Sequence, residues 1–290
     1  MKATFKMEFK IQSSIMAYVG RFSRPNCGIK FLVDNSYRSI NEGAYDVEEY
    51  NHLSHEPLSI KKSILKCNHA PLITEIKLSS PSRGNLSASL NETNIAFAAR
   101  EMADNGAIAL SILTQPYLFS GSIKHLCAVR KYVSVPILMK DIIVSEVQIE
   151  SAKRIGADCI LLIKSVFDHD LAEGSLEKFA TLARIKGLST LVEVHSENEF
   201  KDVLDDSATY DMIGINNRDL DTLEVDLGVT RRLLQKYDKG KNIIVSESGI
   251  SFPDQIVLLK EIGADAFLIG TSIIRSGSIM SKVRELYQSF

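Results

Sequence analysis

The chain has 290 residues, of which 45% are hydrophobic and 24% charged, and its formal net charge is −2. This balance is typical of a globular protein of one large domain with a modest extension, and it argues against nucleic-acid binding, which usually needs a basic excess. No apolar run reaches the roughly 20 residues that span a bilayer. Lys6, Glu8 and Lys10 also interrupt the place where a signal peptide would have its apolar core. We therefore expect a cytoplasmic protein without membrane association.

The four cysteines, at positions 27, 67, 127 and 159, lie far apart and form no C-x-x-C pair. This spacing predicts neither a disulfide framework nor a zinc site. His52 and His55 stand three residues apart, but no further ligand lies nearby, so a solvated loop is the favoured interpretation.

Residues 1–70 are predicted to form an N-terminal extension. Residues 20–57 are rich in Asn, Ser, Gly and Tyr and are expected to form an irregular arm. The segment 59–67, SIKKSILKC, predicts a helix just before the first strand. This helix would either plug the bottom of the domain that follows or cover its mouth.

From about residue 71 the chain repeats one pattern: a short apolar run, a polar stretch containing glycine, and an amphipathic segment. Near-continuous apolar runs are typical of parallel strands that are buried on both faces. The eight predicted strands are 71–76, 107–113, 136–140, 159–163, 190–194, 211–216, 242–247 and 266–270.

Helix signals occupy the segments between these strands. Residues 92–105 and 145–155 each run up to a glycine, and residues 253–262 begin with a proline in the first turn. In the second of these helices, Ser145 is the predicted N-cap and Val147 is expected on the buried face.

Strands that alternate with helices from residue 71 to residue 290 favour a closed barrel over an open sheet. The predicted fold class is therefore α/β, with a single (β/α)₈ TIM barrel at 71–290 as catalytic domain and an N-terminal helical extension at 1–70.

The active site of such a barrel lies at the C-terminal ends of its strands, and these ends are unusually polar here. Glu75 and Glu193 stand inside apolar strands, where a carboxylate needs a partner or a polar pocket. Lys77 and Lys140 follow two strand ends. A single lysine in this position is usually a solvated loop charge. Two carboxylates and two lysines that converge on one mouth instead indicate an acid–base site.

The last two strands predict a phosphate site. Gly249 and Gly270 lack a Cβ, so their backbone N–H groups can approach an anion closely. The loops after the seventh and eighth strands form the recurrent phosphate cradle of this architecture, and Arg218 and Lys77 would neutralise the charge. The alternative is that both glycines only serve tight turns.

Six segments in order along the chain resemble the indole-3-glycerol-phosphate synthase family of tryptophan biosynthesis. They are TEIKxxSPS (74–82), PILMKD (136–141), LVEVH (191–195), IGINNRDL (213–220), SESGI (246–250) and FLIGTS (267–272). The resemblance covers residues 60–290. It implies a carboxy-lyase that closes an indole ring in 1-(2-carboxyphenylamino)-1-deoxyribulose 5-phosphate, with loss of carbon dioxide and water. It implies no metal and no organic cofactor.

The resemblance also assigns roles to the matching residues. Lys140 resembles the general acid that protonates the substrate ketone, and Glu193 resembles the general base. Lys77 matches the lysine that meets the substrate carboxylate and assists dehydration, and Glu75 would orient both lysines. The other matching residues are Asn216 and Glu247 at the sugar hydroxyls, Arg218, Ser248, Gly249, Gly270 and Thr271 around the phosphate, and Ser80, Pro81 and Phe119 elsewhere in the substrate site.

One position departs from the family pattern. The residue after the Lys-Asp pair is commonly phenylalanine in the family and packs against the substrate ring, whereas this chain has Ile142. Phe119 matches the other aromatic residue of the family. The loss of one ring–ring contact would cost about 0.5–1.5 kcal/mol of binding free energy.

Two alternatives remain open at this point. One is another phosphate-binding barrel enzyme, an isomerase or a Schiff-base lyase, although no cysteine stands at the C-terminal end of a strand here. The other is a non-catalytic barrel that binds a phosphorylated metabolite, which would be expected to have lost Lys140 or Glu193. The expected partner is a small phosphorylated substrate. The expected assembly is a monomer or weak homodimer, open to contact with other tryptophan-pathway enzymes.

Overall fold

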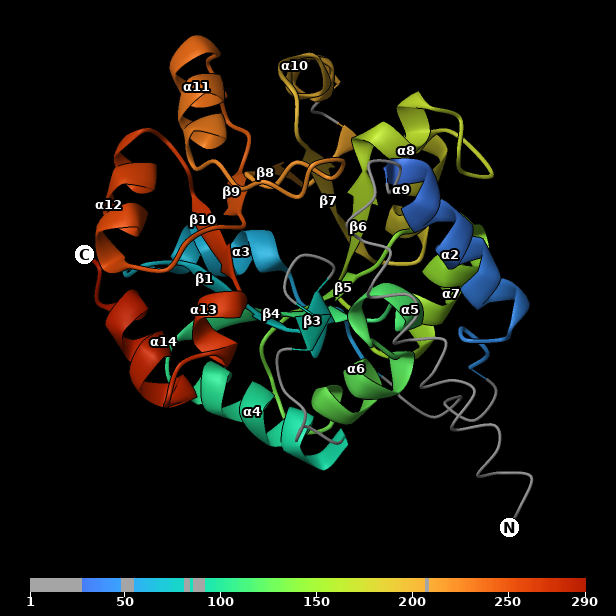
Figure 1. The fold of residues 1–290 in the computed structure, drawn as a ribbon, viewed down its shortest axis with the longest axis horizontal. Coiled ribbons are helices and arrows are strands. Elements are labelled where there is room, and N and C mark those ends of the chain that lie inside the picture. Colours follow the sequence, from blue (N-terminus) through green and yellow to red (C-terminus); the bar gives the residue numbers. More distant parts are fainter. Residues whose placement is uncertain (1–27, 48–54, 81–83, 86–91, 207–208) are drawn as a thin grey trace.

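The computed structural model describes residues 28–47, 55–80, 84–85, 92–206 and 209–290. Eight parallel strands close into a barrel in the order β1-β10-β9-β8-β7-β6-β5-β4, and the helices form a ring around it (Figure 1). The predicted TIM barrel is confirmed, since each predicted apolar run is one strand. The strands are β1 (Leu72–Ile76), β4 (Ala107–Leu113), β5 (Ile137–Lys140), β6 (Cys159–Ile163), β7 (Ser189–Val194), β8 (Met212–Asn216), β9 (Ile244–Glu247) and β10 (Ala266–Ile269).

The connections between the strands carry the helices of the outer ring. A short antiparallel pair, β2 (Ser79–Ser80) and β3 (Gly84–Asn85), follows β1. The helices are α4 (Glu92–Asp104), α5 (Pro116–Phe119), α6 (Ile123–Arg130), α7 (Glu146–Arg154), α8 (Lys164–Asp168), α9 (Leu176–Ile185), α10 (Glu197–Asp205), α11 (Gly228–Lys236), α12 (Pro253–Glu261), α13 (Thr271–Ile274) and α14 (Ile279–Tyr287). The predicted helices at 92–105, 145–155 and 253–262 are thus confirmed as α4, α7 and α12.

Within α7, the predicted N-cap is confirmed but the predicted buried face is wrong at one position. The Ser145 hydroxyl accepts a hydrogen bond from the backbone N–H of Val147. The Val147 side chain, however, is 48% exposed, and Gln148 is fully buried in its place. The reason is that the Gln148 Oε1 atom folds back to accept hydrogen bonds from the N–H groups of Val144 and Ser145, at 2.8 and 3.2 Å.

The N-terminal extension contains two described helices, α2 (Ile29–Asn41) and α3 (Ile60–Lys66). The helix expected at 59–67 is confirmed as α3. The expectation of an irregular arm over 20–57 is wrong for 29–41, which is helical along its whole length. Cys27 and His52 lie outside the described residues, so the predictions for Cys27 and for the His52–His55 pair stay predictions.

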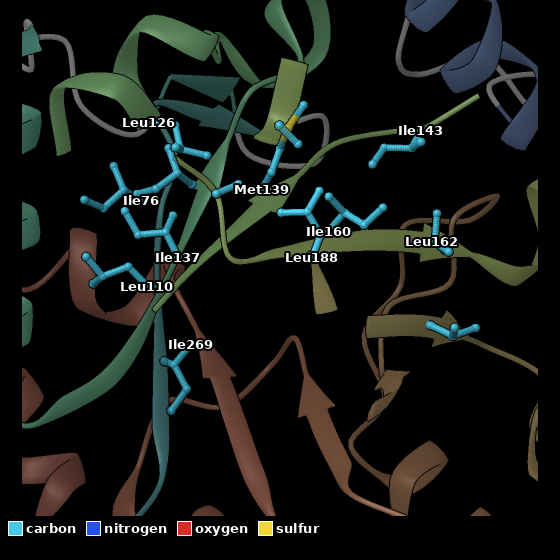
Figure 2. Packing of buried hydrophobic residues seen from close by; sticks show 14 of the residues in the cluster. Ile76, Leu110, Leu126, Ile137, Met139, Ile143, Ile160, Leu162, Leu188 and Ile269 are labelled. Atoms are coloured by element: carbon cyan, nitrogen blue, oxygen red, sulfur yellow. The ribbon is translucent and has the colours of Figure 1, made fainter. Parts of the chain in front are cut away.

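The core consists of two layers because alternate residues of each strand point to opposite sides. One set faces outward and packs under the helices; Figure 2 shows part of this layer, including Leu110, Ile137, Met139 and Ile160. The other set points into the barrel and includes Ile73, Leu138, Leu191, Val245 and Leu268. Two positions after Ile73, Leu138, Leu191 and Val245, the inward direction is kept by polar strand-end residues, Glu75, Lys140, Glu193 and Glu247.

The helix α3 plugs the bottom of the barrel, at the N-terminal ends of the strands. Its Ile60 and Ile64 side chains belong to the interior cluster. The segment just before it is fixed by Asp158, the residue that precedes β6. Asp158 accepts hydrogen bonds from the backbone N–H of Leu58, at 2.6 Å, and from the guanidinium of Arg130, at 2.9 Å, and His55 lies 2.6 Å from it.

Within the described part of the chain, we find no helix that combines the length and the apolar character that crossing a membrane requires.

The network at the bottom of the barrel predicts a large stability effect. Replacement of Asp158 by Ala would leave the buried Arg130 guanidinium without its carboxylate, and we expect a loss of about 3–5 kcal/mol in the free energy of unfolding. Denaturant unfolding measures this loss. The control is Glu150→Ala, which removes two surface ion pairs, with Arg154 and Lys186, and should cost at most about 1 kcal/mol. Equal losses in the two variants would contradict the prediction.

Candidate active site

A cavity of about 300 Å³ opens at the C-terminal ends of the barrel strands. Its polar wall comes from six different strands or strand ends, and its apolar wall comes from the barrel interior and the N-terminal extension. The polar residues named from the sequence that line it are Glu75, Lys77, Lys140, Glu193, Asn216, Arg218, Glu247, Ser248, Gly249, Gly270 and Thr271. The structure thus brings the predicted acid–base and phosphate residues to one cavity.

Lys140, the last residue of β5, lies at the centre of the polar wall. Its Nζ atom donates hydrogen bonds to Glu193 Oε2 and to Glu247 Oε2, both at 2.6 Å. Burial opposes the charge of this lysine, but Glu193, Glu247 and then Glu75 outweigh burial and raise the pKa of Lys140 above its ordinary value. Lys140 is therefore a protonated group at neutral pH, and two of its three N–H donors are engaged.

The two carboxylates that hold Lys140 differ in their own protonation. Burial raises the pKa of each, but Lys140 and His195 reverse this effect at Glu193, whose pKa lies below its ordinary value. Asn216 also donates to Glu193 Oε1 at 3.1 Å. At Glu247 burial prevails over Lys140, and the repulsion from Glu193 adds to it, which raises the pKa of Glu247 to about 7. Glu193 is thus an ionised base, beside a Glu247 whose pKa lies above its ordinary value.

A second ion pair stands at the end of β1. Lys77 Nζ lies 2.7 Å from Glu75 Oε1, and both side chains are largely buried. Glu75 also adds to the negative potential at Lys140. It therefore holds Lys77 directly and acts on Lys140 through space.

Two glycines make room for these carboxylates. A Cβ at Gly214 would lie 2.2 Å from Glu247 Oε1, and a Cβ at Gly270 would lie 2.8 Å from Glu75 Oε1. Both contacts are too short for any other residue. Gly270 therefore has a packing role besides the predicted approach to an anion, and sequence reasoning missed Gly214, which lies between two hydrophobic residues of β8.

The loops after β9 and β10 form the side of the cavity where phosphate was expected. Ser248 and Gly249 have φ values of +67° and +88°, so the chain makes a tight left-handed turn. The turn is held by Asn217, whose Nδ2 atom donates to the carbonyl oxygens of Glu247 and Ser248, at 2.9 and 3.2 Å. The Ser272 hydroxyl donates to Ile250 O at 3.0 Å and joins the two loops.

Arg218 lies on the same side of the cavity. Its guanidinium donates to Leu223 O at 2.8 Å, and its backbone N–H donates to Asn216 Oδ1 at 3.0 Å. The exposed Arg275, just after α13, also lines the cavity and was missed in the sequence. Its position in a polar C-terminal segment carried no signal that distinguished it from a solvated charge.

The opposite wall of the cavity is apolar. Phe119, at the end of α5, lines it as the sequence predicted, and Ile142 lies where the family pattern has an aromatic ring. Leu32 of α2 completes this wall, and the expected irregular arm offered no sign of that contact. Of the remaining predicted residues, Ser80 lies in β2, and Pro81 falls outside the described residues.

The strand end at Lys140 is tied to the extension through Asp141. Its buried carboxylate accepts hydrogen bonds from the hydroxyls of Tyr45, at 2.9 Å, and Thr114, and from the backbone N–H of Ile142 at 2.8 Å. The Ser36 hydroxyl of α2 donates to Ile142 O at 2.5 Å. Burial raises the pKa of Asp141 to about 6, although the hydrogen bonds from Thr114, Tyr45 and Ile142 oppose this shift.

Comparison with known proteins identifies relatives over most of the chain. A family model described as Indole-3-glycerol phosphate synthase matches residues 35–286. The Indole-3-glycerol phosphate synthase of Methanocaldococcus jannaschii is 43% identical over 258 residues, which cover 88% of this chain and 91% of that protein. The protein of the same description from Aquifex aeolicus is 40% identical over 227 residues, which cover 78% and 84%.

Solved structures with the same fold are much more distant in sequence. A thiamine phosphate pyrophosphorylase from Pyrococcus furiosus superposes with a TM-score of 0.56 at 14% identity, over 80% of this chain and 97% of that one. An N-acetylmannosamine-6-phosphate 2-epimerase from Clostridium perfringens gives 0.56 at 12% identity, over 76% and 93%. At these identities the likeness shows the barrel fold alone.

The contact at Gly214 predicts the effect of one added methyl group. Gly214→Ala would push Glu247 away from Lys140, and the overpacked site should lower the free energy of unfolding by about 1–3 kcal/mol. Urea unfolding measures the change. The matched control is Gly277→Ala, because nothing lies within 4 Å of a Cβ at Gly277. A Gly214 variant as stable as this control would refute the close packing.

The raised pKa of Asp141 predicts a pH-dependent stability. The folded protein binds this proton more readily than the unfolded chain, so the contribution of Asp141 to stability falls as the pH rises from about 4 through about 6. Asp141→Asn removes this dependence. Relative to the wild type, the variant should gain on the order of 2–3 kcal/mol between pH 4.5 and pH 7.5, as measured by urea unfolding. A difference that is independent of pH would contradict the assignment.

Proposed function

We propose that this chain, which belongs to the indole-3-glycerol phosphate synthase family, converts 1-(2-carboxyphenylamino)-1-deoxyribulose 5-phosphate into indole-3-glycerol phosphate as a carboxy-lyase of tryptophan biosynthesis. The observation that carries the proposal is the buried Lys140 ammonium between Glu193 and Glu247, in the same cavity as the Lys77–Glu75 pair. Ring closure needs an acid at the ketone oxygen, the dehydration that follows needs a base at the ring carbon, and this cluster supplies both.

In the first step Lys140 acts as general acid. The ketone oxygen of the substrate receives a proton while the aromatic carbon that bears the carboxylate attacks the ketone carbon. The high pKa of Lys140 keeps it charged until the developing alkoxide accepts the proton, and its third N–H, not held by Glu193 or Glu247, is the donor. Loss of carbon dioxide then restores the electron pair to the ring.

The second step removes water from the indoline intermediate. Glu193, whose low pKa keeps it ionised, accepts the proton from the ring carbon. Lys77, held by Glu75, first meets the substrate carboxylate and then donates a proton to the leaving hydroxyl, which departs as water. Asn216 and Glu247 bind the sugar hydroxyls and thereby hold the substrate in position beside the two lysines.

The substrate's two ends fit the two walls of the cavity. The phosphate is placed against the loops after β9 and β10, where Ser248, Gly249, Gly270 and Thr271 offer backbone N–H groups and Arg218 offers charge. Ser80 and Pro81 are assigned to the substrate site on the family motif alone. The aromatic ring is placed against Phe119, with Ile142 and Leu32 giving aliphatic contacts.

The finer expectations from the sequence belong to the same proposal. We propose a division into an extension at 1–70 and a catalytic barrel at 71–290, a cytoplasmic location, and a monomer or weak homodimer in contact with other tryptophan-pathway enzymes. The hydrogen bonds of Asp141 and Ile142 with Tyr45 and Ser36 support a working unit that includes the extension.

The decisive assay mixes the purified protein with the carboxyphenylamino-deoxyribulose phosphate and follows indole fluorescence. We expect turnover without added metal, and we expect Lys140→Ala to lower kcat/KM by about 10²–10⁴-fold because the general acid is lost. Lys164→Ala is the matched control: Lys164 stands directly after the end of β6 and its side chain is as buried as that of Lys140, but it pairs with Asp168 and does not line the cavity.

Three results would contradict the proposal: an inactive wild type, a Lys140 variant that keeps most of its activity, or equal losses in the two lysine variants. Borohydride trapping with the substrate tests the Schiff-base alternative. We expect Lys140 to remain unmodified, because its raised pKa leaves little neutral amine to form an imine.

A further inference from the structure

His195 lies directly behind the proposed base. It follows β7 by one residue and Glu193 by two, so both side chains leave the strand on the same side. The Nε2 atom of His195 lies 3.3 Å from Glu193 Oε1. Lys140 holds the other oxygen of this carboxylate, Oε2. The base is therefore flanked by two groups that can carry positive charge, one at each oxygen.

The imidazole does not touch the space where a substrate would bind. His195 is absent from the described residues that line the cavity, and its side chain is only 14% exposed. Both ring nitrogens are shielded from water, and neither has a hydrogen bond of good geometry within the described residues, so the 3.3 Å approach of Nε2 to Glu193 Oε1 is an ionic contact. Buried polar groups normally have hydrogen-bond partners, so a buried imidazole without them is unusual. The charged atom nearest to its nitrogens is Glu193 Oε1.

The backbone around His195 is rigidly held. Ser196 is the N-cap of α10, and the Glu199 carboxylate accepts hydrogen bonds from the N–H groups of His195, at 2.7 Å, and Ser196, at 3.3 Å. This capping box holds the backbone from which the imidazole projects. Residues 193–199, E-V-H-S-E-N-E, thus contain the proposed base Glu193, His195, and Glu199, which accepts the hydrogen bond from the backbone N–H of His195.

Acidic groups surround His195 from several elements. They are Glu193 on β7, Glu199 on α10, Glu247 on β9, and Asp219 in the loop after β8. Burial lowers the pKa of His195, but Glu193, and then Glu199 and Glu247, more than reverse this effect, so the pKa lies above its ordinary value. The imidazolium is the form that these neighbours favour at neutral pH.

We propose that His195 is a positioning residue for the reaction: its imidazolium holds the Glu193 carboxylate ionised and oriented, at the oxygen opposite Lys140. The inference rests on the proposed role of Glu193 as base. When the substrate ketone takes the proton of Lys140, Glu193 loses the charge of its first partner. The positive charge of His195 then balances the negative charge of Glu193, so that Glu193 stays ionised for the step in which it accepts a proton.

The proposal predicts a pH-dependent effect of His195→Gln, a change that keeps a side-chain N–H donor and removes the charge. Below the pKa of His195 the variant should have a kcat about tenfold lower, part of the roughly 10²–10⁴-fold that a general base contributes. Its KM should stay within about twofold, since the residue does not touch substrate. Above that pKa the wild type also carries a neutral imidazole, so the ratio of the two kcat values should fall toward one.

The experiment compares kcat and KM from pH 6 to pH 10 for the wild type, His195→Gln and the control His169→Gln, which replaces an exposed histidine. Urea unfolding at each pH shows whether the variants stay folded. A ratio of kcat values that does not change with pH indicates a packing role and overturns the proposal. A change in KM with constant kcat overturns it as well.

Histidine NMR provides a readout that does not depend on turnover. In the wild type, the resonance missing from His195→Gln should titrate above about 6.5, the ordinary histidine value, and it should move to lower pH in Glu193→Gln. Titration at or below 6.5, or no response to Glu193→Gln, overturns the inference. A wild type without synthase activity would overturn the proposed function instead, so the two failures are distinguishable.

Discussion

The buried charge of Lys140 is the constraint on which the rest of the site depends. An ammonium in a closed barrel mouth is stable only with carboxylates at hydrogen-bond distance, and Glu193 and Glu247 both stand at 2.6 Å. These carboxylates need space and partners of their own. Gly214 supplies the space beside Glu247, and Asn216 and His195 contact Glu193. The pKa of the Lys140 ammonium is thereby set by residues of several strands.

The barrel and the location of its chemistry could be predicted from the sequence because both follow from short-range pattern. Buried parallel strands are near-continuous apolar runs, and a glutamate such as Glu193 inside one of them stands out at once. Inward-facing residues recur with a period of two, so that Ile73 leads to Glu75, Leu138 to Lys140 and Leu191 to Glu193.

The features that sequence reasoning missed depend on partners far along the chain. Helix α2 lies in a segment rich in Asn, Ser, Gly and Tyr, yet its Asn35, Ser36 and Ser39 are buried, with side chains that hydrogen-bond to backbone or to neighbouring polar groups. Gln148 is buried and Val147 exposed, the reverse of the hydrophobic pattern, because the capping hydrogen bonds of the Gln148 side chain outweigh hydrophobic periodicity. His195 and Gly214 stand in the motifs, but their function appears only when Glu193 and Glu247 lie beside them.

The proposed catalytic network and the stabilising network occupy opposite ends of the barrel. Lys140 and its carboxylates lie at the mouth, whereas Asp158 lies at the bottom with Arg130 and the segment before α3. A substitution at the mouth can therefore change turnover without changing stability, and a substitution at the bottom can change stability without changing turnover. The Asp141 network is the exception, since it joins the extension to the residue after Lys140.

The Asp158 network also bears on the order of folding. Its contacts with His55 and Leu58 close loops of 103 and 100 residues, whereas its contact with Arg130 spans 28. Because the entropy of loop closure must be overcome before a distant contact gains anything, the local pair with Arg130 can form while β5 and β6 associate. We therefore expect the segment before α3 to dock later, onto a carboxylate that is already in place.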